Sequence, residues 1–180
     1  HAEIKSIKTN EAKKSDGVVD VFTAKEIDEV CKPWIGTLGH LGEMRSPEQT
    51  PLAKKVARWQ GEPVAVVIAD SRAQAEDALE LIEVDWVEKE AQVNMETALD
   101  PNAVVIHTEL GNNLFWTRTV NQGDVEKAFK EADAVVETTL DFARHTGVTL
   151  ESRGIVADWN KAENKMTIYH NGQAPHMMQH

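Results

Sequence analysis

The stretch from Gly61 to Val87 constrains the fold most, because it reads as strand, helix and strand with almost no connecting residues. Residues 64–69 form an unbroken apolar run rich in β-branched side chains. Such a run is typical of a strand buried on both faces, although periodicity alone does not separate it from a buried helix. Ser71 and Gln74 have the spacing of a capping box, which predicts a helix after Ser71. Residues 83–88 then alternate as a half-exposed strand does.

The predicted helix of this stretch has one apolar face. Its members recur at positions i, i+3, i+4 and i+7, and they are Ala75, Ala78, Leu79 and Ile82. We expect all four side chains to pack inward. The stretch contains no nucleophile, no glycine-rich phosphate loop and no paired set of metal ligands, so it is interpreted as a scaffold.

The elements before this stretch are shorter. Strands are predicted over 2–8, 18–22 and 52–59, a short helix over 10–14, and one helical turn over 23–27. The segment 31–51 is predicted to be an irregular loop, because glycines and prolines interrupt it repeatedly.

A second clear helix follows Gly123, with Asp124 as its cap. Its apolar face has the same spacing as that of the first helix and consists of Val125, Ala128, Phe129 and Ala132. Residues 134–142 are predicted to be a strand, and 155–159 and 166–169 a hairpin around a polar loop. Helices beside short strands and long loops indicate an α+β fold, or a mixed α/β one.

Composition excludes several classes of function. The formal net charge of −11 argues against a nucleic-acid partner, because phosphate would be repelled over most of the surface. The single cysteine, Cys31, rules out an internal disulfide framework and a cysteine-ligated iron–sulfur cluster within this chain, and a small hydrophobic role is favoured over a reactive thiol. No apolar stretch approaches the roughly 20 residues that span a bilayer. The chain starts without Met or a signal peptide, so we expect a truncated piece located in the cytoplasm.

The polar side chains offer no convincing catalytic set. His170, His176 and His180 crowd the C-terminus, but they lack helical i, i+4 spacing, so solvated or interface histidines are favoured over metal ligation. The acidic run over 70–85 is interpreted as a solvated face. His145 and Glu151 could form a base and its orienting partner, yet no serine or cysteine in a nucleophile-elbow context accompanies them. From these residues alone, the chain is a globular domain without a catalytic set.

Three stretches together resemble the molybdenum-binding large subunit of the xanthine dehydrogenase/aldehyde oxidase family, which includes carbon monoxide dehydrogenase-like proteins. The first is GEPVAVVIAD at 61–70 with the helix and strand behind it. The second is GDVE at 123–126, with AF at 128–129 and ADAVVE at 132–137. The third is LESRG at 150–154, followed by TIY at 167–169 and QAPH at 173–176. Their order and separations over nearly the whole chain make the resemblance specific.

The resemblance implies two domains and one cofactor contact. Residues 1–107 are expected to form an α/β-hammerhead domain, and 113–180 the first strands and helix of a molybdopterin-binding α+β domain, truncated here. Gln173 stands where related proteins place a glutamine against an oxo ligand of molybdenum, and a strand-end glutamine bonding to the backbone is the alternative. The catalytic glutamate is expected outside this chain, which supplies no catalytic residue and no metal ligand.

The chain departs from the family pattern at several positions. Ser152 replaces the usual proline, and Asn171-Gly172 replaces Ser-Thr before Gln173. His145 lies off the usual spacing from Glu151, so no role is transferred to it.

The implied activity is that of a molybdopterin-dependent oxidoreductase. It would hydroxylate an aldehyde, an N-heterocycle or carbon monoxide with oxygen from water, and pass electrons to iron–sulfur clusters and FAD on partner subunits or domains. The isolated chain would bind no cofactor and be inactive, because the remainder of the large subunit is missing. Two alternatives stay open: a non-catalytic interaction or assembly module that retains the hammerhead scaffold, and a metal hydrolase that uses the terminal histidines.

Overall fold

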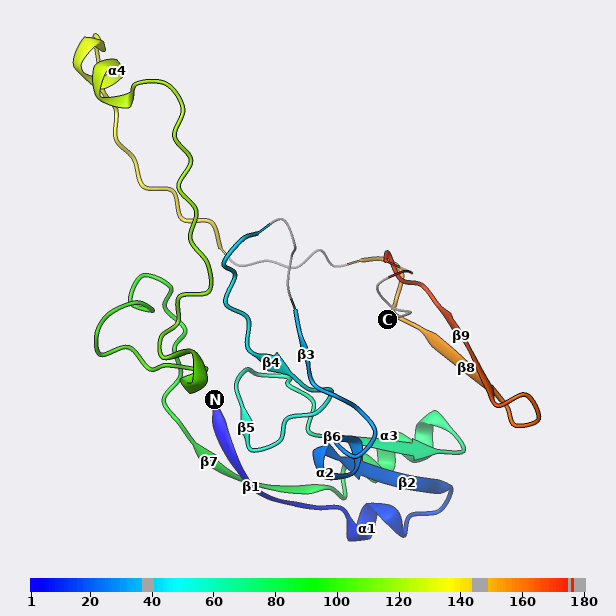
Figure 1. Ribbon diagram of the computed structural model, residues 1–180. Coiled ribbons are helices and arrows are strands. Elements are labelled where there is room, and N and C mark those ends of the chain that lie inside the picture. The colour runs from blue at the N-terminus through cyan, green and yellow to red at the C-terminus, as the bar shows by residue number, and fades with distance from the viewer. Residues whose placement is uncertain (37–40, 144–148, 175, 177–180) are drawn as a thin grey trace. The chain divides into compact units, whose positions relative to one another are not determined.

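The computed structural model describes residues 1–36, 41–143, 149–174 and 176, and the chain divides into two compact units, 1–121 and 122–180 (Figure 1). In the first unit, the elements are β1 (Ala2–Lys8), α1 (Asn10–Lys13), β2 (Val18–Thr23), α2 (Ala24–Ile27), β3 (Trp34–Ile35), β4 (Glu48–Gln49), β5 (Val56–Ala57), β6 (Ala65–Ala69), α3 (Arg72–Leu79), β7 (Glu83–Glu88) and the 3-10 helix η1 (Thr108–Leu110). In the second unit they are α4 (Val125–Glu131), β8 (Ile155–Asn160) and β9 (Lys165–His170).

The strands of the first unit form small antiparallel sheets. One sheet has the order β5-β1-β7, and two further ribbons pair β2 with β6 and β3 with β4. The predicted strand–helix–strand over 61–87 is therefore present as β6, α3 and β7, but its two strands belong to different sheets. This arrangement of helices with antiparallel strands confirms the predicted α+β class.

The core of the first unit is small and lies where α1 and α3 meet β2 and β6. Ala12, Val21 and Ala78 are completely buried, and Val18, Val67 and Ile82 pack against them. The short alanine side chains allow the two helices to approach the ribbon closely. Burial of this apolar surface is the main stabilising contribution to the unit.

Two burial predictions are wrong at the central stretch. Leu79 is 48% exposed, whereas Ala78 beside it is completely buried. The strand β6 is not buried on both faces: Val66 and Ile68 are exposed, whereas Val67 packs inward. Both errors have one cause. A ribbon of two strands is narrow, so it buries only one row of side chains along α3, and α3 in turn covers only one face of the ribbon.

Most of the other elements of the first unit agree with prediction. The strands over 2–8 and 18–22 and the short helix after Thr9 are confirmed. The turn over 23–27 is confirmed as α2, which a Thr23–Glu26 capping box begins. The strand predicted over 52–59 is wrong except at β5. Leu52 and Ala53, whose apolar side chains suggested a strand, are buried but belong to no strand. The predicted loop 31–51 contains the short pair β3–β4.

The second unit contains α4 and the hairpin β8–β9. Asp124 caps α4 by accepting a hydrogen bond from the Lys127 N–H at 3.0 Å, as predicted. The strand predicted over 134–142 is wrong: among the described residues no strand pairs with this segment, and Val136 and Leu140 are 90% and 86% exposed. A strand needs the hydrogen bonds of a neighbour, so β-branched residues alone do not create one.

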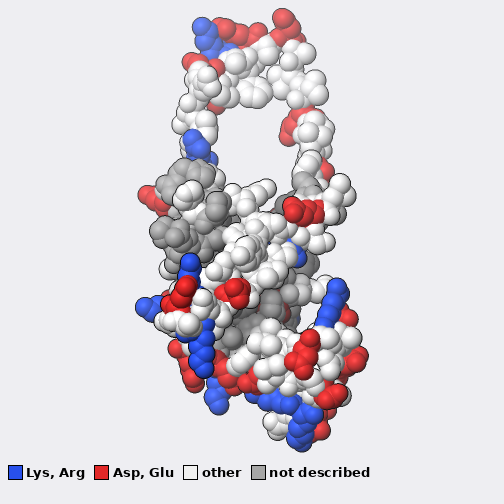
Figure 2. Space-filling view, turned by 90° about the vertical axis from the view of Figure 1, so that its right-hand side faces the viewer, with Lys and Arg blue, Asp and Glu red and all other residues white. Residues whose placement is uncertain are grey.

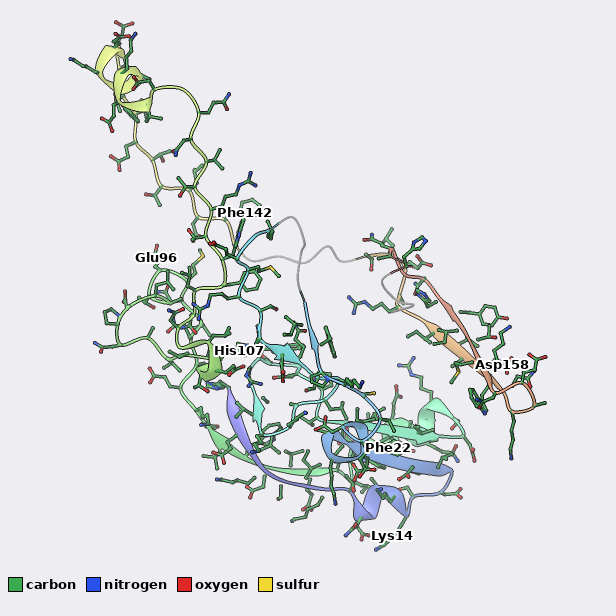
Figure 3. The ribbon with its side chains drawn as sticks, in the orientation of Figure 1. Lys14, Phe22, Glu96, His107, Phe142 and Asp158 are labelled. Atoms are coloured by element: carbon green, nitrogen blue, oxygen red, sulfur yellow. The ribbon has the colours of Figure 1, made fainter. Side chains whose placement is uncertain are left out.

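The hairpin β8–β9 is paired without interruption from Ile155–His170 to Asn160–Lys165. At its closed end, Asn160 Oδ1 accepts hydrogen bonds from the N–H groups of Ala162 at 3.0 Å and Glu163 at 3.2 Å. Figure 3 shows side chains on both sides of the ribbon, with Asp158 labelled. Cross-strand pairing places Trp159 beside Met166 and Ala157 beside Ile168 on one, mainly apolar, face.

Charged side chains of both signs are intermingled on the surface presented in Figure 2. Ion pairs among the described residues join Lys13 with Asp20 at 2.9 Å and Lys8 with Glu83 at 2.8 Å. In the described part of the chain, no helix is both long and apolar enough to cross a membrane.

Candidate functional site

The hairpin β8–β9 brings together the two halves of the third sequence motif. Ile155 and His170 are the last paired residues at the open end of the hairpin, so segments 151–154 and 171–173 leave the two strands side by side. Between them, Asn171 Nδ2 donates a hydrogen bond to the Ser152 carbonyl oxygen at 2.7 Å, and Asn171 Oδ1 accepts one from the Gly154 N–H at 3.1 Å. The segments that resemble the family motif therefore meet at one place in the second unit.

Gly172 lies close to a neighbouring ring. A Cβ atom at this position would lie 2.6 Å from two ring atoms of His170. That separation is shorter than any van der Waals contact, so a larger residue would displace either the ring or the backbone. The chain thus turns out of β9 directly beneath the His170 ring.

Gln173 follows at this open end and is exposed. Its side chain makes no hydrogen bond to any other described residue. A carboxamide has two N–H donors and a carbonyl acceptor and carries no charge, so it suits an oxygen- or nitrogen-rich ligand. The amide of Gln173 therefore fits one contact to a molybdenum cofactor, while the role itself stays a prediction.

The histidines do not form a site in the described structure. His170 lies over Gly172, and His176 is exposed, whereas His145 and His180 lie outside the described residues. Within the parts of the chain that are described, no group of three His, Cys, Asp or Glu side chains could hold a metal ion. Glu151 is exposed.

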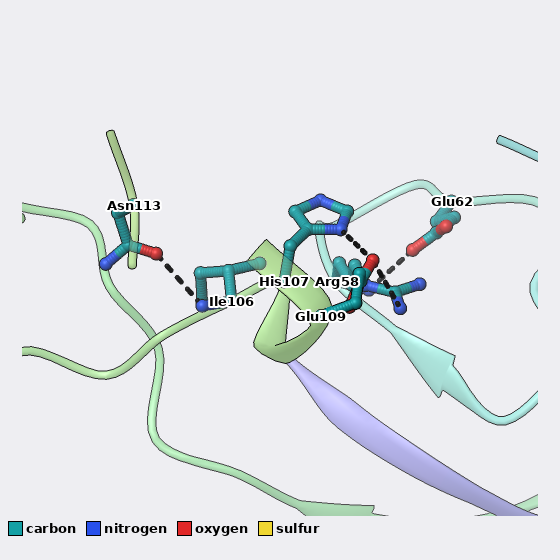
Figure 4. A network of polar contacts seen from close by, with 6 residues as sticks. All are labelled: Arg58, Glu62, Ile106, His107, Glu109 and Asn113. Atoms are coloured by element: carbon teal, nitrogen blue, oxygen red, sulfur yellow. Dashed lines mark hydrogen bonds and ion pairs between the residues drawn. The ribbon is translucent and has the colours of Figure 1, made fainter. Parts of the chain in front are cut away.

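Sequence reasoning missed a polar network in the first unit, which Figure 4 shows. Asn113 Nδ2 donates hydrogen bonds to the carbonyl oxygens of Ala98 and Val104, each at 2.9 Å. Asn113 Oδ1 accepts a third from the Ile106 N–H at 3.0 Å. One side chain thus ties together the irregular segment 98–113, and the Gly-Asn-Asn run at 111–113 was a signal in the sequence.

A second set of contacts fastens this segment to the loop that contains Arg45. The Arg45 guanidinium donates hydrogen bonds to the Leu110 carbonyl oxygen and to Asn112 Oδ1, the latter at 2.7 Å. The Arg45 backbone N–H donates to the Phe115 carbonyl oxygen at 2.9 Å. Trp116 Nε1 donates to the Gly42 carbonyl oxygen at 3.0 Å. Residues 110–116 are therefore part of the first unit.

The same network ends at Glu109, whose carboxylate lies 3.1 Å from His107 Nδ1 and 3.9 Å from Arg58 Nη2. The pKa of Glu109 is lowered, first by its own backbone N–H and then by His107 and Arg58. Arg58 Nε is buried without a hydrogen-bond partner among the described residues, and the Arg58 backbone N–H donates to Glu62.

A hollow of about 370 Å³ lies beside this network, lined by Trp34, Trp59 and Arg58 among others. A second hollow of about 300 Å³ shares Pro47 and His107 with it. Neither contains a nucleophile paired with a base, so the network is best explained as structural: it holds the irregular segment 98–113 within the first unit.

Comparison with known proteins identifies the class. Residues 1–90 match the family model of the aldehyde oxidase and xanthine dehydrogenase a/b hammerhead domain, and residues 106–180 match that of the molybdopterin cofactor-binding domain. The chain belongs to the aldehyde oxidase and xanthine dehydrogenase family. The resemblance inferred from the motifs is thus confirmed. Residues 106–121 of the second match lie within the first compact unit of the structure.

Individual relatives are large subunits of molybdenum hydroxylases. The chain is 32% identical over 98% of its length to the nicotine 6-hydroxylase large subunit of Paenarthrobacter nicotinovorans, and 35% identical over 87% to a probable xanthine dehydrogenase subunit of Bacillus subtilis. It superposes on quinoline 2-oxidoreductase of Pseudomonas putida 86 with a TM-score of 0.85, at 29% identity over 94% of the chain. It covers only 21%, 20% and 21% of these proteins, respectively.

Proposed function

We propose that this chain supplies the hammerhead scaffold and the first part of the molybdopterin-binding domain in the large subunit of a molybdenum hydroxylase. The observation that supports this most is the order of the two family matches, which together extend over nearly the whole chain. The complete enzyme would add a water-derived oxygen atom to a carbon of its substrate. Its electrons would pass to iron–sulfur clusters and FAD on partner subunits or domains.

An aromatic N-heterocycle is the substrate class that we favour. Nicotine, xanthine and quinoline, the compounds in the names of the three relatives above, are all nitrogen heterocycles. Aldehydes and carbon monoxide are the alternatives. A panel of quinoline, xanthine, benzaldehyde and carbon monoxide, each tested with an artificial electron acceptor, separates these classes in the complete enzyme.

In this proposal the residues of the chain bind and orient. The molybdenum cofactor supplies the two-electron redox chemistry when it is bound. The Gln173 amide donates a hydrogen bond to the cofactor without adding charge, and its exposure at the open end of the hairpin leaves it accessible. The first unit contributes its packed core and the network around Asn113 as scaffold. Assembly with the partner subunits would take place in the cytoplasm, which cell fractionation would test.

The experiment is Gln173→Ala in the complete large subunit with its partners, with molybdenum content and turnover measured separately. Loss of one hydrogen bond in a dry site corresponds to roughly tenfold slower turnover. We expect that slowing with the metal content retained. Gln122→Ala, which removes another exposed glutamine outside the motif, is the matched control. Normal turnover of Gln173→Ala at full metal content would overturn the role of Gln173, and a complete subunit that never acquires molybdenum would favour a non-catalytic module.

A further inference from the structure

Asn171 connects the two segments that leave the hairpin at its open end. Beyond the Ile155–His170 pair, the cross-strand hydrogen bonds found among the described residues both use its side chain. The amide donates to the Ser152 carbonyl oxygen and accepts from the Gly154 N–H, so it holds the backbone on both sides of Arg153. A carboxamide is suited to this, because it carries a donor and an acceptor on one planar group.

The next residue, Gly172, lies close to the His170 ring. His170 ring atoms occupy the space that a Cβ atom at Gly172 would need. Asn171 is therefore anchored by its side chain, Gly172 leaves room for the His170 ring, and Gln173 is the next residue. The two hydrogen bonds of the Asn171 side chain thus fix the backbone two residues before Gln173, although Gln173 itself is exposed and makes no hydrogen bond to another described residue.

We propose that Asn171 is a positioning residue for Gln173. The inference rests on the proposed function, in which the Gln173 amide contacts the molybdenum cofactor. By anchoring the strand end, the Asn171 amide lowers the number of conformations that Gln173 must lose when it makes that contact. The resemblance to the family concerns Gln173, whereas the sequence departs from the family pattern at Asn171-Gly172. Asn171 thus lies outside the motif on which the resemblance rests.

The test is amide hydrogen exchange in the complete large subunit, prepared with and without the molybdenum cofactor and followed by mass spectrometry over residues 171–174. In the wild-type subunit, we expect cofactor loading to slow exchange there by roughly fivefold or more, the factor that corresponds to one net hydrogen bond. Asn171→Ala should remove most of this cofactor-dependent slowing. Molybdenum content is measured in each sample, so that exchange is compared at equal loading.

Asn160→Ala is the matched control, because the Asn160 side chain also makes two hydrogen bonds to the backbone, both as acceptor, but at the closed end of the same hairpin. Asn160→Ala should leave the cofactor-dependent slowing of exchange intact. If Asn171 acted only by stabilising the hairpin, Asn160→Ala would reduce the slowing as well. If Asn171→Ala fails to fold or to load, Asn171→Asp decides, since it keeps the acceptor for Gly154 and loses the donor to Ser152. We expect it to retain only part of the slowing.

The outcomes separate the two proposals. If the wild-type subunit shows no slowing, Gln173 does not contact the cofactor and the proposed role of that residue fails. If the wild-type slowing persists unchanged in Asn171→Ala, or in Asn171→Asp where that variant decides, Gln173 makes its contact without help and the positioning role of Asn171 is overturned. An equal loss in Asn160→Ala would also overturn it.

Discussion

Glu26 shows how a single carboxylate begins a helix in this chain. Its Oε2 atom accepts hydrogen bonds from the Thr23 hydroxyl at 2.7 Å and from the Thr23 backbone N–H at 2.8 Å. These two bonds, the hydroxyl first, lower the pKa of Glu26. Protonation of Glu26 would remove the negative charge that strengthens these two hydrogen bonds, and would thereby weaken the capping box that starts α2.

The stability of the first unit should therefore depend on pH through Glu26. Because its folded pKa lies below its unfolded pKa, the contribution of Glu26 is present above the unfolded pKa and is lost as the pH falls through the folded pKa. We expect the urea midpoint to fall as the pH drops below about 4.5, and to fall less in Glu26→Gln. Glu29→Gln, an exposed carboxylate just after α2, is the control. An identical pH dependence of wild type and Glu26→Gln would contradict the expectation.

At the scale of the element, α3 has a narrow buried line. Ala78 is completely buried in the core, and Ile82 packs against that core. Leu79 is 48% exposed although it shares the i, i+3, i+4 pattern. The pattern describes the directions in which side chains point, whereas the width of the covered stripe depends on what lies opposite.

This geometry predicts unequal effects of substitution along α3. Ala78→Leu overpacks the core and should destabilise the unit by about 1–3 kcal/mol. Leu79→Ala removes a half-exposed side chain and should cost less than about 1 kcal/mol, well below the roughly 2–5 kcal/mol of a buried leucine. Urea denaturation of both variants measures the difference. A loss in Leu79→Ala as large as that of a buried leucine would show that this side chain packs inward.

At the scale of the whole chain, the segment that leads from the first unit to the second is an integral part of the first. Asn113 makes three hydrogen bonds to the backbone between 98 and 106, and Arg45 holds residues 110, 112 and 115. The compact unit therefore ends at residue 121 rather than where the irregular segment begins.

We accordingly expect a fragment of residues 1–121 to be more stable than one of residues 1–107. Removal of Asn113 breaks three part-buried hydrogen bonds to the backbone, each of which contributes about 0.5–1.5 kcal/mol. Within the 1–121 fragment, Asn113→Ala should lower the urea midpoint toward that of the shorter fragment. Asn121→Ala, at the last residue of the unit, is the control. Equal midpoints for the two fragments would mean that residues 108–121 contribute nothing to the fold.

The sequence by itself determined the features that rest on neighbouring residues. Caps at Ser71 and Asp124 and the hairpin around 160–165 were predictable, because their hydrogen bonds join residues within a few positions of each other. The family was recognisable for a different reason, since three motifs occur in a specific order. The importance of Gln173 was inferred from one of those motifs, and its place at the open end of the hairpin followed from the strand register.

Only the tertiary structure decided which distant segments meet. The pairing of β6 with β2 and of β7 with β1 depends on contacts between residues far apart in the chain, and no local pattern selects among such partners. The same holds for the segment 134–142, with which no strand pairs among the described residues, and for the exposure of Leu79. The amide bridges of Asn113 and Asn171 were unpredictable because an asparagine can bond to any backbone group that the fold brings within about 3 Å.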